Sequence, residues 1–406
     1  MARRLGACLV VAVALAATAC APDTGEQAST SEDTGSPYRI VQLVGQNQAG
    51  PAAINAQAAA QAAKAAVAVL NANGGILGHR VELEIIDSGG DPTTAVTKLQ
   101  ARLNSGQKPN MVLPGNTSAE ALPMAPVITE AGIFSVQQGS ANALDDPAKF
   151  PFLFKTPPIP ATFAQGLLAQ VKKVGAGKVA MIAGKDAFAQ ATVAATKEAL
   201  AAAGVTLTGE ETYAAEDLDM TAQLERLRSG NPDLVFMQGA GASVGYVLQS
   251  RVKIGWTDVP LVADSTSAVT SLLTKGAPDG LVGTDATKNV FVQVLAAAVG
   301  TTGGPNPDAL NDMLAALKKE GTITLPLNAY FAYDSVMLAA KAAEETKTIT
   351  DAKVQSEWLE KLTPSTKGRW ALANYTFTTK SHGPAVDPAT VAVVPASVLS
   401  DGRYAG

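Results

Sequence analysis

Ser243 lies in a G-x-S-x-G pattern, within GAGASVG, which follows an apolar strand-like run and opens a helix-like one. In an α/β-hydrolase such a serine is the nucleophile, and an acid and then a histidine follow it along the chain. Asp334 and His382 could fill those two roles. However, no HGGG-type oxyanion motif precedes the serine, and several residues separate it from the strand, whereas the hydrolase turn is sharp. We therefore expect a protein that is not an enzyme and keep an extracellular serine hydrolase only as an alternative.

Residues for cofactor or metal chemistry are scarce. The chain has two histidines and two cysteines, which leaves little for metal or thiol chemistry. Gly239, Gly241 and Gly245 imitate a dinucleotide-binding loop but lack the G-x-G-x-x-G spacing. In VGAGKVA, Val179 follows Lys178 where a phosphate-binding loop has Ser or Thr. We expect no cofactor and no metal, and we interpret Gly239 and Gly241 as positions where the backbone approaches a ligand.

Length and charge narrow the class of partner. At 406 residues the chain is long for a single core, so two domains are expected. Hydrophobic residues make up 47% and charged residues 17% of a chain of net charge −5. This composition is globular, and no basic run is present that could follow a nucleic-acid backbone. The partners should be small molecules or proteins, and not nucleic acid.

The N-terminal segment resembles a bacterial lipoprotein signal. A short cationic start is followed by an apolar run and by the small residues of AATAC, which end in Cys20. Ala17 stands where such signals usually have Leu, so ordinary secretion with cleavage after an A-x-A-like site is the alternative. We predict a signal peptide over residues 1–19, and a lipidated Cys20 with a flexible tether over residues 20–36. Beyond this cysteine the chain has none, so it should fold outside the cytoplasm without disulfides.

From Tyr38 onward, strand-like runs alternate with helix-like ones. Helix-ending Gly74 and Gly75, for example, precede the strand RVELEIID. Such alternation, with short apolar strands, predicts an α/β fold of parallel sheets flanked by helices. Ligands bind such sheets at the carboxyl ends of the strands, where Asp87 and Asp91 lie. For this pair we favour helix capping over ligand contact, with Asp91 before Pro92 as the N-cap.

Five segments follow one another along the chain: LNANGGILGHRVELEIIDSGGDPTTAVTKLQ, GNTSAEALPMAPVITEAGIFSV, PFLFKTPPIP, YFAYDSVMLAAKAAEE and VAVVPASVLSDGRY. Together they resemble the branched-chain amino-acid (Leu/Ile/Val) class of ABC-transporter extracytoplasmic solute-binding proteins. The resemblance runs from about Tyr38 to the end of the chain. It implies a periplasmic binding protein type I fold: two Rossmann-like lobes, joined by a three-crossing hinge, with a ligand cleft between them. We expect lobe 1 over residues 37–156 and 284–362, and lobe 2 over residues 157–283 and 363–406.

The resemblance also implies ligand-binding residues in the first lobe. Relatives bind a ligand carboxylate in the loop after the third strand, which here holds Asn116, Thr117 and Ser118. A helix begins there, and its positive end favours an anion. A plain N-cap without ligand is the alternative. The second ligand loop of the family corresponds to Gln138, Gly139 and Ser140. Relatives with small aliphatic ligands usually carry smaller residues where Gln137 and Gln138 stand, so a more polar or larger ligand is expected.

In the second lobe, the resemblance places Phe188 where an aromatic residue, commonly Tyr, covers the ligand. A buried core Phe is the alternative. The next family position is often another Tyr, but here the run is GAGAS, so the pocket should be more open on that side. Asp264 lies near the place where relatives that recognise amino acids have a carboxylate for the ammonium group. The alternative for Asp264 is a helix cap with Ser265 and Thr266.

The resemblance implies a function. We expect a solute-binding lipoprotein that captures a small amino acid, or a related carboxylate or amide, and delivers it to the permease subunits of an ABC importer. The protein should be a monomer outside the cytoplasm, held at the cell membrane only by its lipid anchor. A ligand-sensing lobe that signals to a partner protein would have the same fold and cleft, and is the alternative.

Overall fold

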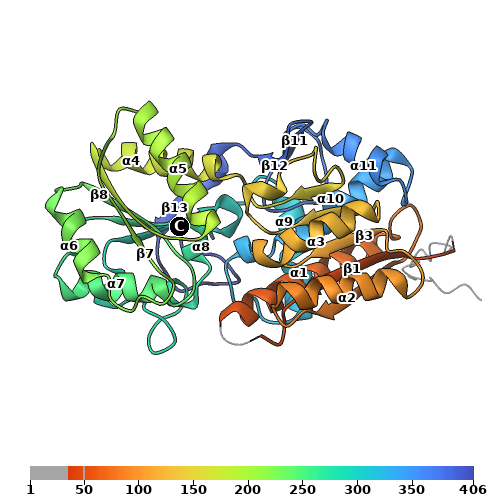
Figure 1. The fold of residues 1–406 in the computed structure, drawn as a ribbon, viewed down its shortest axis with the longest axis horizontal. Helices are drawn as coiled ribbons and strands as arrows, with labels where there is room; N and C mark the ends of the chain where they lie inside the picture. Colours follow the sequence, from red (N-terminus) through yellow and green to blue (C-terminus); the bar gives the residue numbers. More distant parts are fainter. Residues whose placement is uncertain (1–34, 49–50) are drawn as a thin grey trace, which may run out of the picture. The chain divides into compact units, whose positions relative to one another are not determined.

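The computed structural model describes residues 35–48 and 51–406, which fold into two lobes, each built on one sheet (Figure 1). The predicted Cys20 and most of the predicted tether lie outside the described residues. In the first lobe the described residues form a five-stranded parallel sheet of order β2-β1-β3-β4-β5. Its strands are β1 (Tyr38–Val44), β2 (Val81–Asp87), β3 (Met111–Pro114), β4 (Phe134–Gln137) and β5 (Leu153–Lys155).

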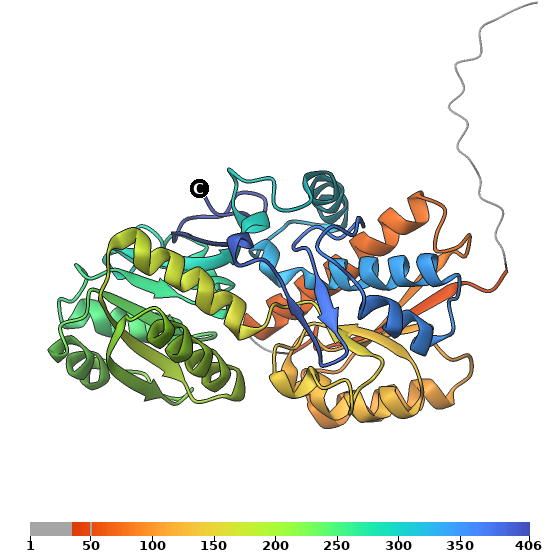
Figure 2. The same cartoon turned by 90° about the horizontal axis from the view of Figure 1, so that it is seen from above.

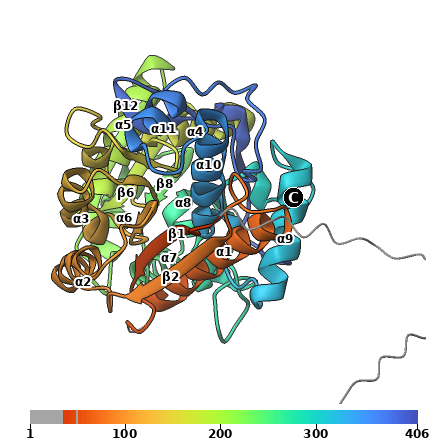
Figure 3. The same ribbon diagram turned by 90° about the vertical axis from the view of Figure 1, so that its right-hand side faces the viewer.

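Helices cover both faces of this sheet, as the end-on view shows (Figure 3). One face carries α2 (Pro92–Asn104) and α3 (Ser118–Glu130), and the other carries α1 (Pro51–Ala72), α9 (Pro307–Glu320), α10 (Phe331–Thr346) and α11 (Ala352–Leu359). The alanines of α1 include Ala62 and Ala66, both fully buried, and this lets the helix lie close to α10 and the sheet. Gly75, which follows the end of α1, has φ of +76°, and a Cβ there would lie 2.0 Å from the carbonyl oxygen of His79, so only glycine fits at this position.

The second lobe contains a six-stranded sheet in the described part of the chain, of order β13-β10-β9-β8-β6-β7. All its pairings are parallel except that of β13 with β10. The strands are β6 (Lys178–Gly184), β7 (Thr206–Tyr213), β8 (Leu234–Gln238), β9 (Leu261–Ala263), β10 (Val290–Leu295) and β13 (Val391–Pro395). The helices are α4 (Pro160–Val174), α5 (Ala187–Ala202), α6 (Thr221–Ser229), α7 (Ser243–Lys253) and α8 (Ser265–Ala268).

Three connections join the lobes within the described residues (Figure 2). They run from β5 to α4, from β10 to α9, and from the hairpin of β11 (Thr376–Thr378) and β12 (Ser381–Ala385) to β13. The hairpin packs against β5 of the first lobe. The predicted two-lobed α/β fold is confirmed. The structure differs at two boundaries, since residues 284–295 belong to the second lobe through the β9–β10 pairing and residues 363–385 belong to the first.

Candidate ligand-binding cleft

A cavity of about 580 Å³ lies where the two lobes face each other, and residues of both lobes line it. Its walls follow the carboxyl ends of parallel strands: Asn116 comes after β3, Gln138 after β4, Asp186 after β6, Ala240 after β8 and Ser265 after β9. This is the edge at which open parallel sheets bind ligands. The volume falls within the usual range for small-molecule sites, roughly 300–1,000 Å³.

The first predicted ligand loop forms one wall. Thr117 has an extended backbone and is the N-cap of α3, since its hydroxyl accepts a hydrogen bond from the Glu120 N–H at 3.4 Å. The first N–H groups of a helix have no partner within the helix, so the start of α3 offers donors at the cavity. The Ser118 Oγ accepts a hydrogen bond from the Ala141 N–H at 2.9 Å, which joins this loop to the second one. Asn116, Thr117 and Ser118 all line the cavity.

The second predicted loop is held from beneath by buried polar groups. The Gln137 side chain accepts from the Gly139 N–H and donates to the Gly139 carbonyl oxygen, so it shapes the loop and does not line the cavity. The Lys155 Nζ donates to the carbonyl oxygen of Ser140 at 3.1 Å. Gln138, Gly139 and Ser140 line the cavity, and Gln138 is only 8% exposed.

The second lobe contributes an aromatic ring and a carboxylate. Phe188, in the first turn of α5, is half-buried and lines the cavity, so it is not a core phenylalanine. Asp186 precedes it and caps α5, accepting hydrogen bonds from the N–H groups of Phe188 at 3.0 Å and Ala189 at 2.9 Å. Asp186 also lines the cavity. The sequence predictions missed this residue, although an Asp before an alanine-rich helix is a recognisable N-cap signal.

Asp264 is a helix cap, as its alternative interpretation stated. Its Oδ1 accepts hydrogen bonds from the N–H of Ser267 at 2.8 Å and from the Ser267 hydroxyl at 2.6 Å. The side chain is 2% exposed, burial raises its pKa, and it is not part of the cavity wall. Ser265 and Thr266 line the wall in its place. The Asp264 Oδ2 has no hydrogen-bond partner among the described residues, and the expected contact between Asp264 and a ligand ammonium group stays a prediction.

The two predicted glycines also lie outside this cavity. A Cβ at Gly239 would lie 2.4 Å from the Tyr213 hydroxyl oxygen, so that glycine accommodates the tyrosine. Gly241, with φ of +60°, lines a smaller adjoining hollow of about 70 Å³ together with Lys275. Between them, Ala240 lines the cavity itself.

Several lining residues come from segments that carried no binding signal in the sequence. Asn55 belongs to the start of α1, and Asn328 belongs to a short 3-10 helix before α10. The others are Leu122, Pro157, Pro158, Phe163, Gln238, Val269, Ala329 and Phe331. Many of them lie at or near the connections between the lobes, where the local sequence does not indicate that the chain lines the cleft.

The residues considered for a hydrolase do not come together. The two ring nitrogens of His382 lie near a backbone carbonyl at 3.0 Å and the Glu360 carboxylate at 3.1 Å. The buried Asp334 accepts hydrogen bonds from two backbone N–H groups and from the Tyr375 hydroxyl. Ser243 donates instead to a carbonyl oxygen of its own loop, at 2.8 Å. The proposed catalytic triad is therefore not formed.

Within residues 35–48 and 51–406, the structure contains no cluster of three or more His, Cys, Asp or Glu side chains placed to hold a metal ion. None of the helices in this part of the chain is long and apolar enough to cross a membrane.

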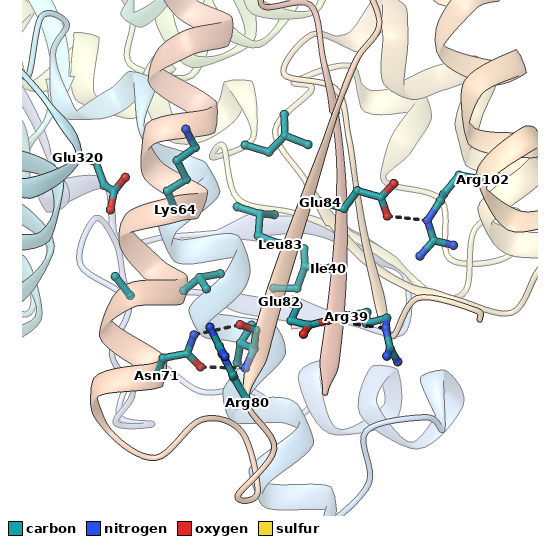
Figure 4. A pocket seen from close by; sticks show the side chains of 14 residues that line it. Arg39, Ile40, Lys64, Asn71, Arg80, Glu82, Leu83, Glu84, Arg102 and Glu320 are labelled. Atoms are coloured by element: carbon teal, nitrogen blue, oxygen red, sulfur yellow. Dashed lines mark hydrogen bonds and ion pairs between the residues drawn. The ribbon is translucent and has the colours of Figure 1, made fainter. Parts of the chain in front are cut away.

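A second hollow, of about 640 Å³, lies beside the edge strand β2 and contains none of the predicted site residues (Figure 4). Four of its charged side chains form two ion pairs: Arg102 Nε lies 2.6 Å from Glu84, and Arg39 Nε lies 3.8 Å from Glu82. The Asn71 carboxamide bonds the backbone of β2. Lys64, Arg80 and Glu320 also line this hollow, but all its lining residues belong to the first lobe, whereas the cleft is lined by the carboxyl-end loops of both lobes.

Known proteins resemble this chain over most of its length. Residues 44–402 match the family described as periplasmic binding protein. A Leu/Ile/Val-binding protein, BraC3, of Rhizobium johnstonii is 25% identical over 75% of this chain and 80% of its own length. An amino acid binding protein of Pseudomonas aeruginosa is 25% identical over 72% of this chain and 74% of its own.

Solved structures share the fold. The branched-chain amino acid transporter substrate binding protein LivJ of Streptococcus pneumoniae, in complex with isoleucine, aligns with a TM-score of 0.65 and 19% identity, over 86% of this chain and 99% of its own. A solute binding protein of R. palustris, in complex with 4-hydroxybenzoate, aligns with a TM-score of 0.68 and 18% identity, over 90% of this chain and 94% of its own. The resemblance predicted from the sequence motifs is confirmed by these matches. This chain belongs to the periplasmic binding protein family.

Proposed function

We propose that this protein captures a small amino acid, or a related carboxylate or amide, in the cleft and delivers it to an ABC importer. The observation that carries the proposal is the cleft itself, in which two loops at the carboxyl ends of β3 and β4 face α5 of the other lobe. The names of the relatives support the same ligand class. Isoleucine and 4-hydroxybenzoate, bound by two proteins of like fold, share a carboxylate.

In this proposal, different residues of the cleft bind different groups of the ligand. The N–H groups and hydroxyls at Thr117 and Ser118 would receive the ligand carboxylate, since the start of α3 carries partial positive charge. Phe188 would cover an apolar part of the ligand from the other lobe. Among the described residues that line the cavity, Asp186 carries the carboxylate that would meet an ammonium group. Closure of the lobes would strengthen these hydrogen bonds by excluding water.

The proposed setting is extracytoplasmic, as family membership implies. Cys20 would be lipidated and would hold a monomeric protein at the membrane, with the permease subunits of the importer as its partners. The protein itself would carry out no chemistry on the ligand. Loss of uptake in a strain that lacks this protein, restored by the native gene, would support delivery to an importer. Unchanged uptake would favour the sensing alternative.

A thermal-shift screen of the purified protein against amino acids and small carboxylates tests binding. A ligand at a hundred times its dissociation constant adds about 2.7 kcal/mol to the free energy of unfolding, which gives a clear rise in melting temperature. At least one compound of this class should produce that rise. If every amino acid and small carboxylate leaves the melting temperature unchanged, the proposed ligand class is wrong.

A further inference from the structure

Five carboxamide side chains line the cleft in the described part of the chain. They come from both lobes and from the connections between them; in the described part of the chain they are Asn55, Asn116, Gln138, Gln238 and Asn328. Gln138 and Asn328 are 8% and 7% exposed, so these side chains are built into the wall and are not solvated surface groups.

Four of these carboxamides each have one buried polar atom with no hydrogen-bond partner among the described residues. The atoms are Asn55 Oδ1, Asn116 Oδ1, Gln138 Nε2 and Asn328 Nδ2. A buried donor or acceptor without a partner costs about 1–3 kcal/mol, so proteins rarely leave several of them together. The four residues that carry these atoms all line one cavity, and the atoms are two acceptors and two donors. The arrangement is explained if a ligand supplies the missing partners.

The charges of the wall show what kind of group fits. Among the described residues that line the cavity, Asp186 is the one carboxylate, and no lysine or arginine is present. Asp186 and the start of α3 suit the ammonium and carboxylate groups of an amino acid. No further charge remains to match a charged side chain of the ligand. The unpartnered carboxamides, which offer both donors and acceptors, match a neutral polar group.

We propose that the cleft selects amino acids whose side chain carries a hydroxyl or a carboxamide, in preference to branched aliphatic ones. This inference rests on the proposed function and specifies its ligand class. The physical reason is the cost of mismatch: an apolar side chain would leave the wall carboxamides buried and unpartnered, whereas a hydroxyl or carboxamide would pair with them. A site built to hydrogen-bond its ligand discriminates strongly against an analogue that lacks the group.

Pairs of amino acids of nearly equal shape test the inference. Asparagine is compared with leucine, and threonine with valine, by calorimetry on the purified full chain. We expect the polar member of at least one pair to bind at least about tenfold more tightly, a difference of about 1.4 kcal/mol. Tighter or equal binding of leucine and valine would overturn this inference and leave the proposed function standing. No binding of any amino acid or small carboxylate would overturn both.

Variants of the wall separate recognition from folding. Gln138→Met and Asn328→Leu replace carboxamides with apolar side chains of similar size, so each should reduce the preference for the polar ligand about tenfold. The melting temperature of free Gln138→Met should not fall, because the variant removes a buried amide nitrogen that has no partner. Asn328→Leu should lower the melting temperature, because the Asn328 Oδ1 accepts a hydrogen bond from the Leu295 N–H at 3.2 Å, so Gln138→Met is the cleaner test. Gln170→Met is the matched control, since Gln170 is also buried but lies on α4 outside the cavity wall. An unchanged preference in both wall variants would contradict the proposal.

Discussion

Lys155→Met should strongly destabilise the protein at neutral pH. The Lys155 side chain is fully buried, and its Nζ lies 2.6 Å from the Oδ1 of Asp145, whose side chain is 13% exposed. At an effective dielectric constant near 20, two charges at that separation attract by about 6 kcal/mol. Burial nevertheless lowers the pKa of Lys155 and raises the pKa of Asp145, so desolvation outweighs this attraction for both groups. The pair is therefore costly to break, although it adds little net stability.

The expected loss follows from what remains after the substitution. Methionine keeps most of the apolar stem, but Asp145 is left as a buried carboxylate without its cation, which costs about 3–5 kcal/mol. Without Lys155 the pKa of Asp145 rises further, so the folded protein can bind a proton at that carboxyl. The loss should consequently be smaller at pH 5 than at pH 7.5. The carbonyl oxygen of Ser140 also loses its donor, so ligand affinity should fall.

Urea unfolding followed by circular dichroism measures this effect at both pH values. The double variant Lys155→Met/Asp145→Asn should recover more than half of the lost stability, because no buried charge remains. Lys149→Met is the control: Lys149 lies 3.6 Å from Asp146 but is 72% exposed, so its loss should cost less than about 1 kcal/mol. If the double variant is no more stable than the single one, the cost arises from packing and the reasoning is refuted.

Four further substitutions test separate parts of the account. Burial raises the pKa of Asp334 from 3.8 to about 6, so its contribution to stability is complete below about pH 4 and is lost as the pH rises through 6. Tyr375→Phe removes the hydroxyl that donates to the Asp334 carboxylate, with 2.5 Å between the two oxygens. In urea unfolding, the loss of free energy should be larger at pH 7.5, where this carboxylate is ionised, than at pH 5. Tyr404→Phe removes a hydrogen bond from the Tyr404 hydroxyl to a backbone carbonyl oxygen, so it should lower the free energy of unfolding by the same amount at both pH values. Ser243→Ala should change ligand affinity by less than about tenfold, roughly 1.4 kcal/mol, and purified protein should show no esterase activity that depends on Ser243. Cys20→Ser should move the protein from the membrane fraction to the soluble fraction without lowering its melting temperature; retention in the membrane would contradict lipidation.

The sequence allowed much of the fold to be predicted, because strand–helix alternation specifies parallel sheets. It did not show to which sheet β10 belongs, since that depends on its hydrogen bonds to β9, a pairing between separate segments. The predicted loops at Ser118 and Gln138 line the cavity because each directly follows a strand. That they bind a ligand stays a prediction. Asn328 was missed because its place in the wall is set by packing at a connection between the lobes.

Asp264 lies one position away from the residues that line the cavity, and its contact with a ligand stays a prediction. The residue after a strand and before a helix can face the cavity or cap the helix, and a change of one position decides which. Asp264 turns its carboxylate to Ser267, and the next residue, Ser265, faces the cavity. Asp186 has both roles, because it caps α5 and also lines the cavity. Local sequence gives the cap in both cases, but the orientation of the remaining oxygen depends on the tertiary structure.

The central claim, that this cleft is the ligand site, is tested most directly by filling it. Ala119 lies in the first turn of α3, is exposed and lines the cavity, so Ala119→Trp should occupy the cleft without disturbing the core. Ala201→Trp, at an exposed position near the end of α5, is the matched control. Calorimetry with the best ligand of the thermal-shift screen should show one site in the native protein and in the control, and a loss of affinity of about 100-fold, roughly 2.7 kcal/mol, in Ala119→Trp. Native affinity in a folded Ala119→Trp variant would show that the ligand binds elsewhere.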